Sequence, residues 1–257
     1  MDPNSPALRI HALGALRIES QLATTHLNGA RPRKLQELLL ALIAAGASGV
    51  SPQRLCEALW PDSDGDAAYR ALITTVFRLR RWLGCHDAIR FAGGCVALCA
   101  RHCWVDAWEL ETALAAGARV GVETLALYRG PLCGDADAPW LLDARERLRR
   151  KFVRAVLQVV ARLEQTGRAG DAIDLCERAA ETDGVSEELH RELIALHGRQ
   201  GQATAASAAY RRCRAALLRH FGMRPSESTE RVLREACQRP PDTHFFPYAS
   251  ATSPWAP

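Results

Sequence analysis

The sequence predicts a mainly α-helical protein with a small β component, built from two structured domains. Short alternating strands and a glycine-centred hairpin occur only within the first 105 residues, whereas long segments elsewhere repeat apolar residues at helical spacing. The second half also contains an internal repeat with an offset of 34 residues. A chain of 257 residues, 48% of them hydrophobic, is long enough to form two ordinary domains with buried cores.

The net charge of +4 comes entirely from the first part of the chain. Residues 1–105 contain 12 Lys and Arg against 8 Asp and Glu, whereas residues 106–257 contain 21 of each. This asymmetry favours an anionic partner for the first part. Arg outnumbers Lys by 31 to 2, so guanidinium groups would make nearly all contacts with phosphates.

The sequence also predicts where the protein is found. No apolar run approaches the roughly 18–20 residues that cross a bilayer, and the N-terminus lacks the pattern of a signal peptide. We therefore expect a cytoplasmic protein without a membrane partner. Its nine cysteines are then expected to be reduced thiols, and an odd number cannot all pair internally.

The first hundred residues are predicted to form short strands followed by three helices. The strands are expected at Leu8–Ile10, Leu16–Ile18 and near His26–Leu27. The helices are expected at Arg33–Ala45, from Pro52 through Trp60 behind the N-cap Ser51, and from an N-cap at Asp66 to about Leu83.

The third of these helices predicts a surface suited to DNA. Its core face has apolar residues spaced i, i+4, i+7 and i+11, namely Leu72, Val76, Leu79 and Leu83. A second face has nearly the same spacing, i, i+4, i+8 and i+11, with Arg70, Thr74, Arg78 and Arg81, and with Thr75 and Arg80 at its edges. In a major groove, Arg bonds bidentately to guanine, and Thr offers a methyl to thymine or a hydroxyl to phosphate. A solvated basic helix face is the plainer interpretation of this helix taken alone.

A β-hairpin follows directly. Ile89–Phe91, a glycine turn and Val96–Leu98 predict strand, turn and strand, with Arg90 and Arg101 at the base. Strands, three helices and a hairpin in this order define a winged helix-turn-helix. We expect this DNA-binding domain to span residues 1–104.

The runs PRKLQELLLALIAAGASGVSPQRLCEALWPD and ALITTVFRLRRWLG resemble the winged helix of the SARP transcription activators. The resemblance implies that Arg78 reads bases, that Thr74 points into the groove, and that Arg70, Thr75 and Arg80 contact phosphates. The helical wheel adds Arg81 as a base-reading candidate. Further phosphate contacts are expected from Arg31, Arg33, Lys34 and Arg90. The chain departs from the family at Ile73, where a short polar or acidic residue is usual.

The second half is predicted to form TPR-like helical repeats. The offset of 34 residues superposes Gly167 on Gly201, Ala169 on Ala203, Ala172 on Ala206 and Arg178 on Arg212. Glycine in the turn and alanine in the second helix are typical of tetratricopeptide units, which must stack to bury their apolar faces. Earlier helices are expected at 106–120, with Asp106 as N-cap, and at 141–165, and a capping helix at 226–238.

This half resembles the bacterial transcriptional activator domain (BTAD) that follows the winged helix in SARP proteins. The shared landmarks include WVDAW at 104–108, YRGPL at 128–132 and FGMRPS at 221–226. We expect the domain at residues 105–238, with a disordered tail at 239–257. The resemblance implies an activator that binds direct repeats in double-stranded DNA beside a promoter. Its repeat domain would contact RNA polymerase or form a homodimer, and no cofactor is implied.

Several other functions remain as alternatives. Cys95, Cys99 and Cys103, with His102 and more distantly Cys85 and His86, are candidate zinc or redox residues, although no C-x-x-C pair is present. The acidic loop at 62–66 lacks the order of a calcium site. No catalytic motif or P-loop is found, so we expect no enzyme. The main rival is a TPR scaffold for protein–protein interaction, whose winged helix does not read DNA.

Overall fold

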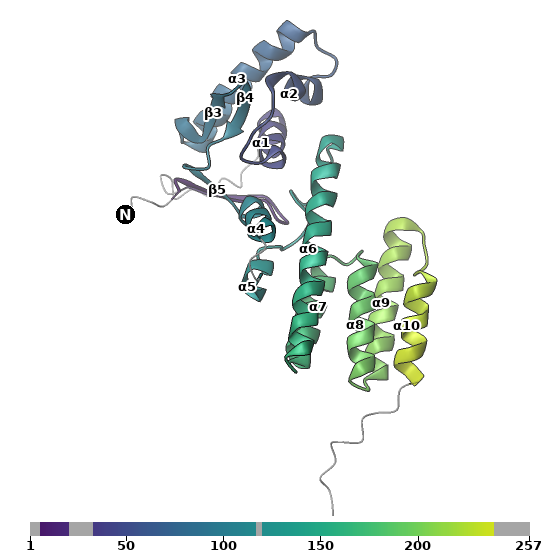
Figure 1. Ribbon diagram of the computed structural model, residues 1–257. Coiled ribbons are helices and arrows are strands. Elements are labelled where there is room, and N and C mark those ends of the chain that lie inside the picture. The colour runs from purple at the N-terminus through teal and green to yellow at the C-terminus, as the bar shows by residue number, and fades with distance from the viewer. Residues whose placement is uncertain (1–5, 21–32, 117–119, 239–257) are drawn as a thin grey trace, which may run out of the picture. The chain divides into compact units, whose positions relative to one another are not determined.

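The computed structural model describes residues 6–20, 33–116 and 120–238 (Figure 1). The chain folds into two compact units, residues 1–155 and 156–257, with the boundary inside one long helix. The predicted fold class, mainly helical with few strands, is confirmed. The strand expected near His26–Leu27 lies outside the described residues, as do Arg31 and the tail. No helix in the described ranges is both long enough and apolar enough to cross a membrane.

The first unit contains a three-stranded sheet in the order β2-β1-β5. Strands β1 (Leu8–His11) and β2 (Arg17–Ser20) are antiparallel, and β5 (Cys103–Val105) pairs with β1 in parallel. The apolar residues of β1 and β2 are buried together because alternate side chains of a strand share one face. Strands β1 and β5 pair although nearly a hundred residues separate them in the sequence. The end of the winged helix therefore lies beside its beginning.

Three helices belong to the same unit: α1 (Arg33–Ala45), α2 (Pro52–Leu59) and α3 (Gly65–Leu83), which pack against one another. Ser51 caps α2 by accepting the Arg54 amide, as predicted. The cap of α3 differs from the prediction: Asp64, rather than Asp66, accepts an amide hydrogen bond, 2.8 Å from the Ala67 nitrogen. Helix α3 ends at Gly84, whose φ of 66° suits a glycine C-cap.

The predicted hairpin is present as β3 (Ile89–Ala92) and β4 (Cys95–Leu98), after a short 3-10 helix, η1 (His86–Ala88). Its two-residue turn, Gly93-Gly94, has φ values of 58° and 73°. Positive φ at both turn residues matches the twist of a tight hairpin, which is why glycines stand here. Val96 exchanges two backbone hydrogen bonds with Val50, which fastens the hairpin to the segment before α2.

Helix α4 (Asp106–Ala115) is held to the winged helix by two side chains. The N-cap position belongs to Val105, not to Asp106 as predicted. The Asp106 carboxylate instead accepts hydrogen bonds from the backbone of Ala12 and Leu13, at 2.7 and 3.2 Å. Burial raises the pKa of this carboxyl, although the hydrogen bonds from those amides act to lower it. Trp108 donates its indole hydrogen to the Ile43 carbonyl, at 2.9 Å.

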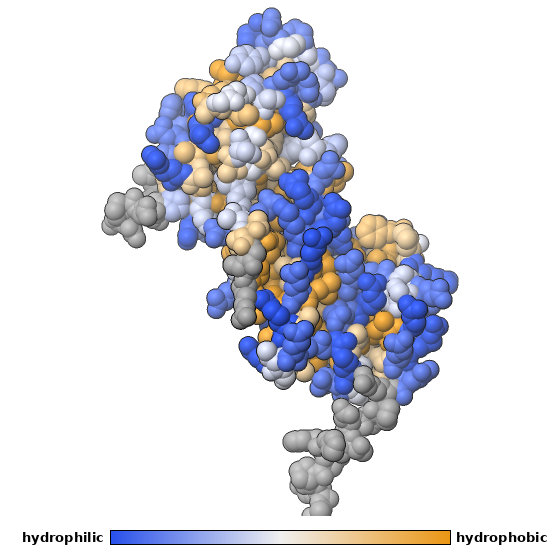
Figure 2. All heavy atoms as spheres, viewed as in Figure 1, coloured by the Kyte–Doolittle hydropathy of each residue, from blue (hydrophilic) through white to orange (hydrophobic). Residues whose placement is uncertain are grey.

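The long helix α6 (Pro139–Gln165) follows the short α5 (Val122–Leu125). It starts in the first unit and ends in the second. Hydrophilic side chains gather along α6 on the face shown in Figure 2. Its inward positions are buried, among them Leu141, Leu148 and Val156.

The second unit continues with α7 (Ala169–Thr182), α8 (Glu187–Arg199), α9 (Ala203–Phe221) and α10 (Glu227–Gln238). The predicted repeat is visible in its turns, since Gly167 and Gly201 have φ values of 73° and 68°. Ala172 and Ala206 are completely buried, which lets neighbouring helices approach closely. Helix α8 packs against α7, α9 and α10.

Candidate nucleic-acid interface

Helix α3 presents a continuous polar face to solvent. Arg70, Thr74, Arg78 and Arg81, which we call the polar row, are all exposed. On the opposite side, Leu72 and Leu79 are completely buried and fix the rotation of the helix. The sequence spacing therefore predicted correctly which residues of these two sets face solvent and which form the core.

The charge on this face is of one sign. From residue 67 to residue 86 the chain contains four Arg and no Asp or Glu. Within the described residues, no ion pair engages the guanidiniums of Arg70, Arg78 or Arg81. These three groups are therefore available to an anionic ligand at no cost in broken salt bridges.

A second exposed row was not identified from the sequence. Tyr69, Ile73 and Phe77 are 48%, 41% and 60% exposed, and we call them the apolar row. They precede Arg70, Thr74 and Arg78 by one residue each. The i, i+4, i+8 spacing could have revealed this row, but apolar residues on a helix are ordinarily assigned to the core.

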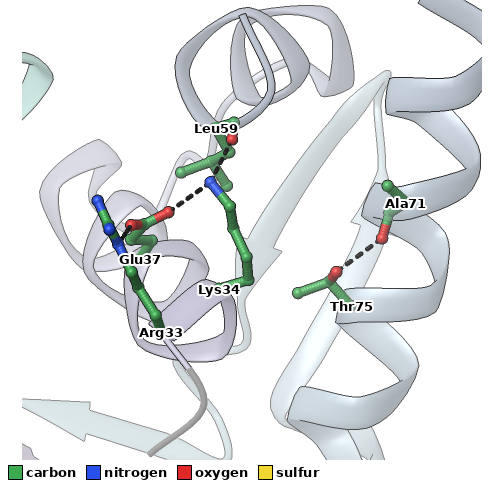
Figure 3. A network of polar contacts seen from close by, with 6 residues as sticks. All are labelled: Arg33, Lys34, Glu37, Leu59, Ala71 and Thr75. Carbon is green, nitrogen blue, oxygen red and sulfur yellow. Dashed lines mark hydrogen bonds and ion pairs between the residues drawn. The ribbon is translucent and has the colours of Figure 1, made fainter. Parts of the chain in front are cut away.

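The two threonines of α3 differ in what they can contact. Thr75 is only 8% exposed, and its hydroxyl donates to the Ala71 carbonyl at 2.7 Å (Figure 3). This burial is at odds with the expected phosphate contact. Thr75 stands at the edge of the face on a helical wheel, and the packed core covers that edge. Thr74 is exposed, and its hydroxyl donates to the Arg70 carbonyl at 3.0 Å.

Arg80 links α3 to the hairpin. Its Nε and Nη2 donate to the Ile89 carbonyl oxygen at 3.2 and 2.7 Å. The guanidinium carbon lies 5.9 Å from the centre of the Phe91 ring. Arg80 was expected to contact phosphate, but two of its donors are already used within the protein. Arg90, on β3, is exposed.

The basic residues at the start of α1 form a network with Glu37 (Figure 3). Arg33 and Lys34 bond to opposite oxygens of the Glu37 carboxylate, at 2.7 and 2.8 Å. Partial burial of the Glu37 carboxylate acts to raise its pKa. The hydrogen bonds from Lys34 and Arg33 outweigh this effect and hold the pKa of Glu37 below its ordinary value. Lys34 also donates to the Leu59 carbonyl and lies 5.6 Å from the centre of the Trp60 ring. Lys34 thus joins α1 to the end of α2, whereas the Arg33 side chain is 90% exposed.

Among the cysteines near the hairpin, Cys103 is buried, whereas Cys85 and Cys99 are half-buried. Burial raises the pKa of the Cys103 thiol to about 12, with smaller effects of Cys85 and Cys99, and its sulfur donates to the Ala88 carbonyl. Cys95 is half-buried. Across the ranges that the structure describes, no group of three or more His, Cys, Asp or Glu side chains could hold a metal ion.

Comparison with known proteins identifies the second half of the chain. The model of the bacterial transcriptional activator domain matches residues 107–236, half of the chain. The structure is similar to Mycobacterium tuberculosis EmbR in complex with a low-affinity phosphopeptide, with a TM-score of 0.62 and 20% sequence identity. The match covers 92% of this chain and 66% of that one, so this chain spans slightly less than two thirds of EmbR's length. Comparison with curated protein sequences finds no match.

The chain therefore belongs to the bacterial transcriptional activator domain family. The predicted resemblance to SARP-type transcription regulators is confirmed by this match and by the fold of both units. This is a family of regulators and not a class of enzymes.

Proposed function

We propose that the protein is a sequence-specific transcription regulator that binds double-stranded DNA by inserting α3 into the major groove. The polar row carries this proposal. It offers three guanidiniums that form no ion pair within the described ranges, on one exposed face of a helix that the core holds in place. Arg is the side chain best suited to a guanine edge and to phosphate.

The residues of the interface take different roles. Arg78 and Arg81 read base edges with Thr74 beside them, while Arg70, Arg33 and Arg90 contact phosphates, which set register and affinity. Arg80 positions the hairpin against α3 and contacts phosphate only with the donors that Ile89 leaves. Lys34 is held by Glu37 and Leu59, so we give it a minor role, and we omit Thr75.

The repeat-containing half would supply the regulatory output. We propose that it contacts RNA polymerase or a second copy of the chain, and that the protein activates promoters flanked by direct repeats. Membership of the activator domain family supports this role. We further propose domain boundaries at 104/105 and 238/239. We also propose that the protein functions in the cytoplasm.

Selection of genomic DNA fragments by the purified protein at near-physiological salt tests the proposal. We expect one shared motif, with two copies in direct repeat, and an affinity that falls steeply as salt rises because phosphate binding releases counterions. Fragments no more enriched than random DNA, together with salt-insensitive binding of a protein partner to the repeat unit, would favour the scaffold function instead.

A further inference from the structure

Exposed large apolar side chains are unusually concentrated on α3. Among the described residues, nine such side chains are exposed, and three of them form the apolar row. Because successive members are four residues apart, they follow one face of the helix at intervals of about 6 Å. Scattered single residues of this kind are normal on a protein surface, whereas a contiguous row indicates a contact.

The neighbours of the row indicate what it contacts. Each member precedes a member of the polar row by one residue, so the two rows run along neighbouring faces of the helix, about 100° apart. Aromatic and Arg side chains are also enriched at protein–protein interfaces, so what favours an anionic partner here is the absence of any Asp or Glu between residues 67 and 86. The major groove of DNA combines both chemistries, because anionic phosphates and guanine acceptors lie beside the C5-methyl group of thymine.

Thr74 adds to the apolar side of this face. Its hydroxyl proton is directed to the Arg70 carbonyl within the helix. The hydroxyl is thus already used as a donor, and the methyl group is what remains for apolar contact. Thymine methyls are the only apolar groups on base edges in the major groove, so they are what Ile73, Phe77 and Thr74 could bury there.

We propose that the apolar row makes the protein select thymines next to the guanines bound by Arg78, by burying their C5-methyl groups. This inference rests on the proposed function, since it requires α3 to lie in the major groove. It extends that function by assigning base-reading roles to Ile73 and Phe77, and it predicts binding sites in which thymine stands next to guanine.

Replacing single thymines by deoxyuridine in the best selected fragment tests the proposal, because uracil lacks only the methyl. We expect the affinity to fall about fourfold at one to three positions, the effect of exposing one methyl-sized apolar group. In Ile73→Ser or Phe77→Ser, the same uracil substitutions should change affinity by less than about 1.5-fold at the positions that residue covers. Leu142→Ser, on α6, is the matched control, since Leu142 is 55% exposed and should leave every uracil effect unchanged.

Two results would overturn the proposal. One is a selected fragment on which no uracil substitution changes affinity. The protein would then bind DNA without reading thymine methyl groups. The other is an Ile73→Ser protein that retains the full uracil effects but changes its oligomeric state, which would make the row a protein contact. Failure of the proposed DNA binding would give a result different from both of these, because no fragment would then be selected at all.

Discussion

The guanidinium of Arg80 donates two hydrogen bonds to the backbone carbonyl oxygen of Ile89, from Nε at 3.2 Å and from Nη2 at 2.7 Å. This contact joins the last turn of α3 to the first residue of the hairpin. It also explains why an arginine at this position is only half-exposed, between the exposed Arg78 and Arg81. The proposed reading helix and the hairpin are thereby held in one orientation.

Arg80→Ala should lower the free energy of unfolding by about 1–3 kcal/mol, since it leaves a carbonyl without its charged partner. Arg80→Lys should recover little of the stability lost in Arg80→Ala, because an ammonium group cannot donate from two nitrogens to the same carbonyl oxygen as the guanidinium does. Chemical denaturation measures both effects. Arg81→Ala is the control, expected to stay within about 0.5 kcal/mol as an exposed substitution. If Arg80→Lys were as stable as the wild type, charge alone would account for the role of Arg80.

Arg70→Ala should weaken binding to all DNA sequences to a similar extent. An arginine that neutralises one phosphate contributes about 0.9 to the slope of log affinity against log salt, so the slope should become shallower by about 1. Salt titrations of the variant and the wild type on the same fragments measure this. An unchanged slope together with a changed base preference would make Arg70 a base-reading residue instead.

Gly198→Ala should destabilise the second unit. A Cβ at Gly198 would lie 2.6 Å from Cβ and 2.8 Å from Cα of Ala236, where α8 and α10 meet. Overpacking of this kind costs about 1–3 kcal/mol. Gly170→Ala, in α7, has nothing within 4 Å and should instead be neutral or stabilising by up to about 1 kcal/mol. Equal stability of the two variants in thermal denaturation would contradict the close contact of α8 with α10.

His190 should make the second unit less stable in acid. Burial lowers the pKa of its imidazole, the Gly184 carbonyl and Asp183 oppose this shift, and Arg212 adds to it. Since the unfolded chain binds the proton more readily, stability is complete above the ordinary pKa of 6.5 and is lost as pH falls below it. His190→Gln removes this titration. The variant should therefore lose less stability than the wild type between about pH 7.5 and pH 5.5. Parallel losses in both proteins would assign the acid sensitivity to other groups.

Local patterns were enough to predict much of the fold. The bounds of α1 at Arg33–Ala45 follow from its apolar period and from Gly46, which stands just past its end. The hairpin follows from its two glycines, and the helical repeat from glycine and alanine at equivalent positions. In each case the deciding interactions lie within a few residues of one another.

The structure differs from the sequence predictions where the hydrogen-bond partners of a side chain are distant in the sequence, or where several candidate residues stand close together. Asp106 was expected to cap its own helix, but besides the adjacent Ala107 amide its carboxylate accepts hydrogen bonds from Ala12 and Leu13, more than ninety residues away. Three acidic residues stand close together at the start of α3, and the spacing alone did not decide that Asp64 is the cap. The position of Thr75 on a helical wheel could not show that the core covers it.

Binding of the Arg78→Ala variant tests the central claim most directly. Its affinity would be compared with that of the wild type on the best selected fragment and on a scrambled fragment of equal length. If α3 reads the major groove, the variant should lose about 1–3 kcal/mol on the selected fragment and little on the scrambled one. An equal loss on both would reduce Arg78 to a phosphate contact, and no loss on either would contradict the claim that α3 reads DNA.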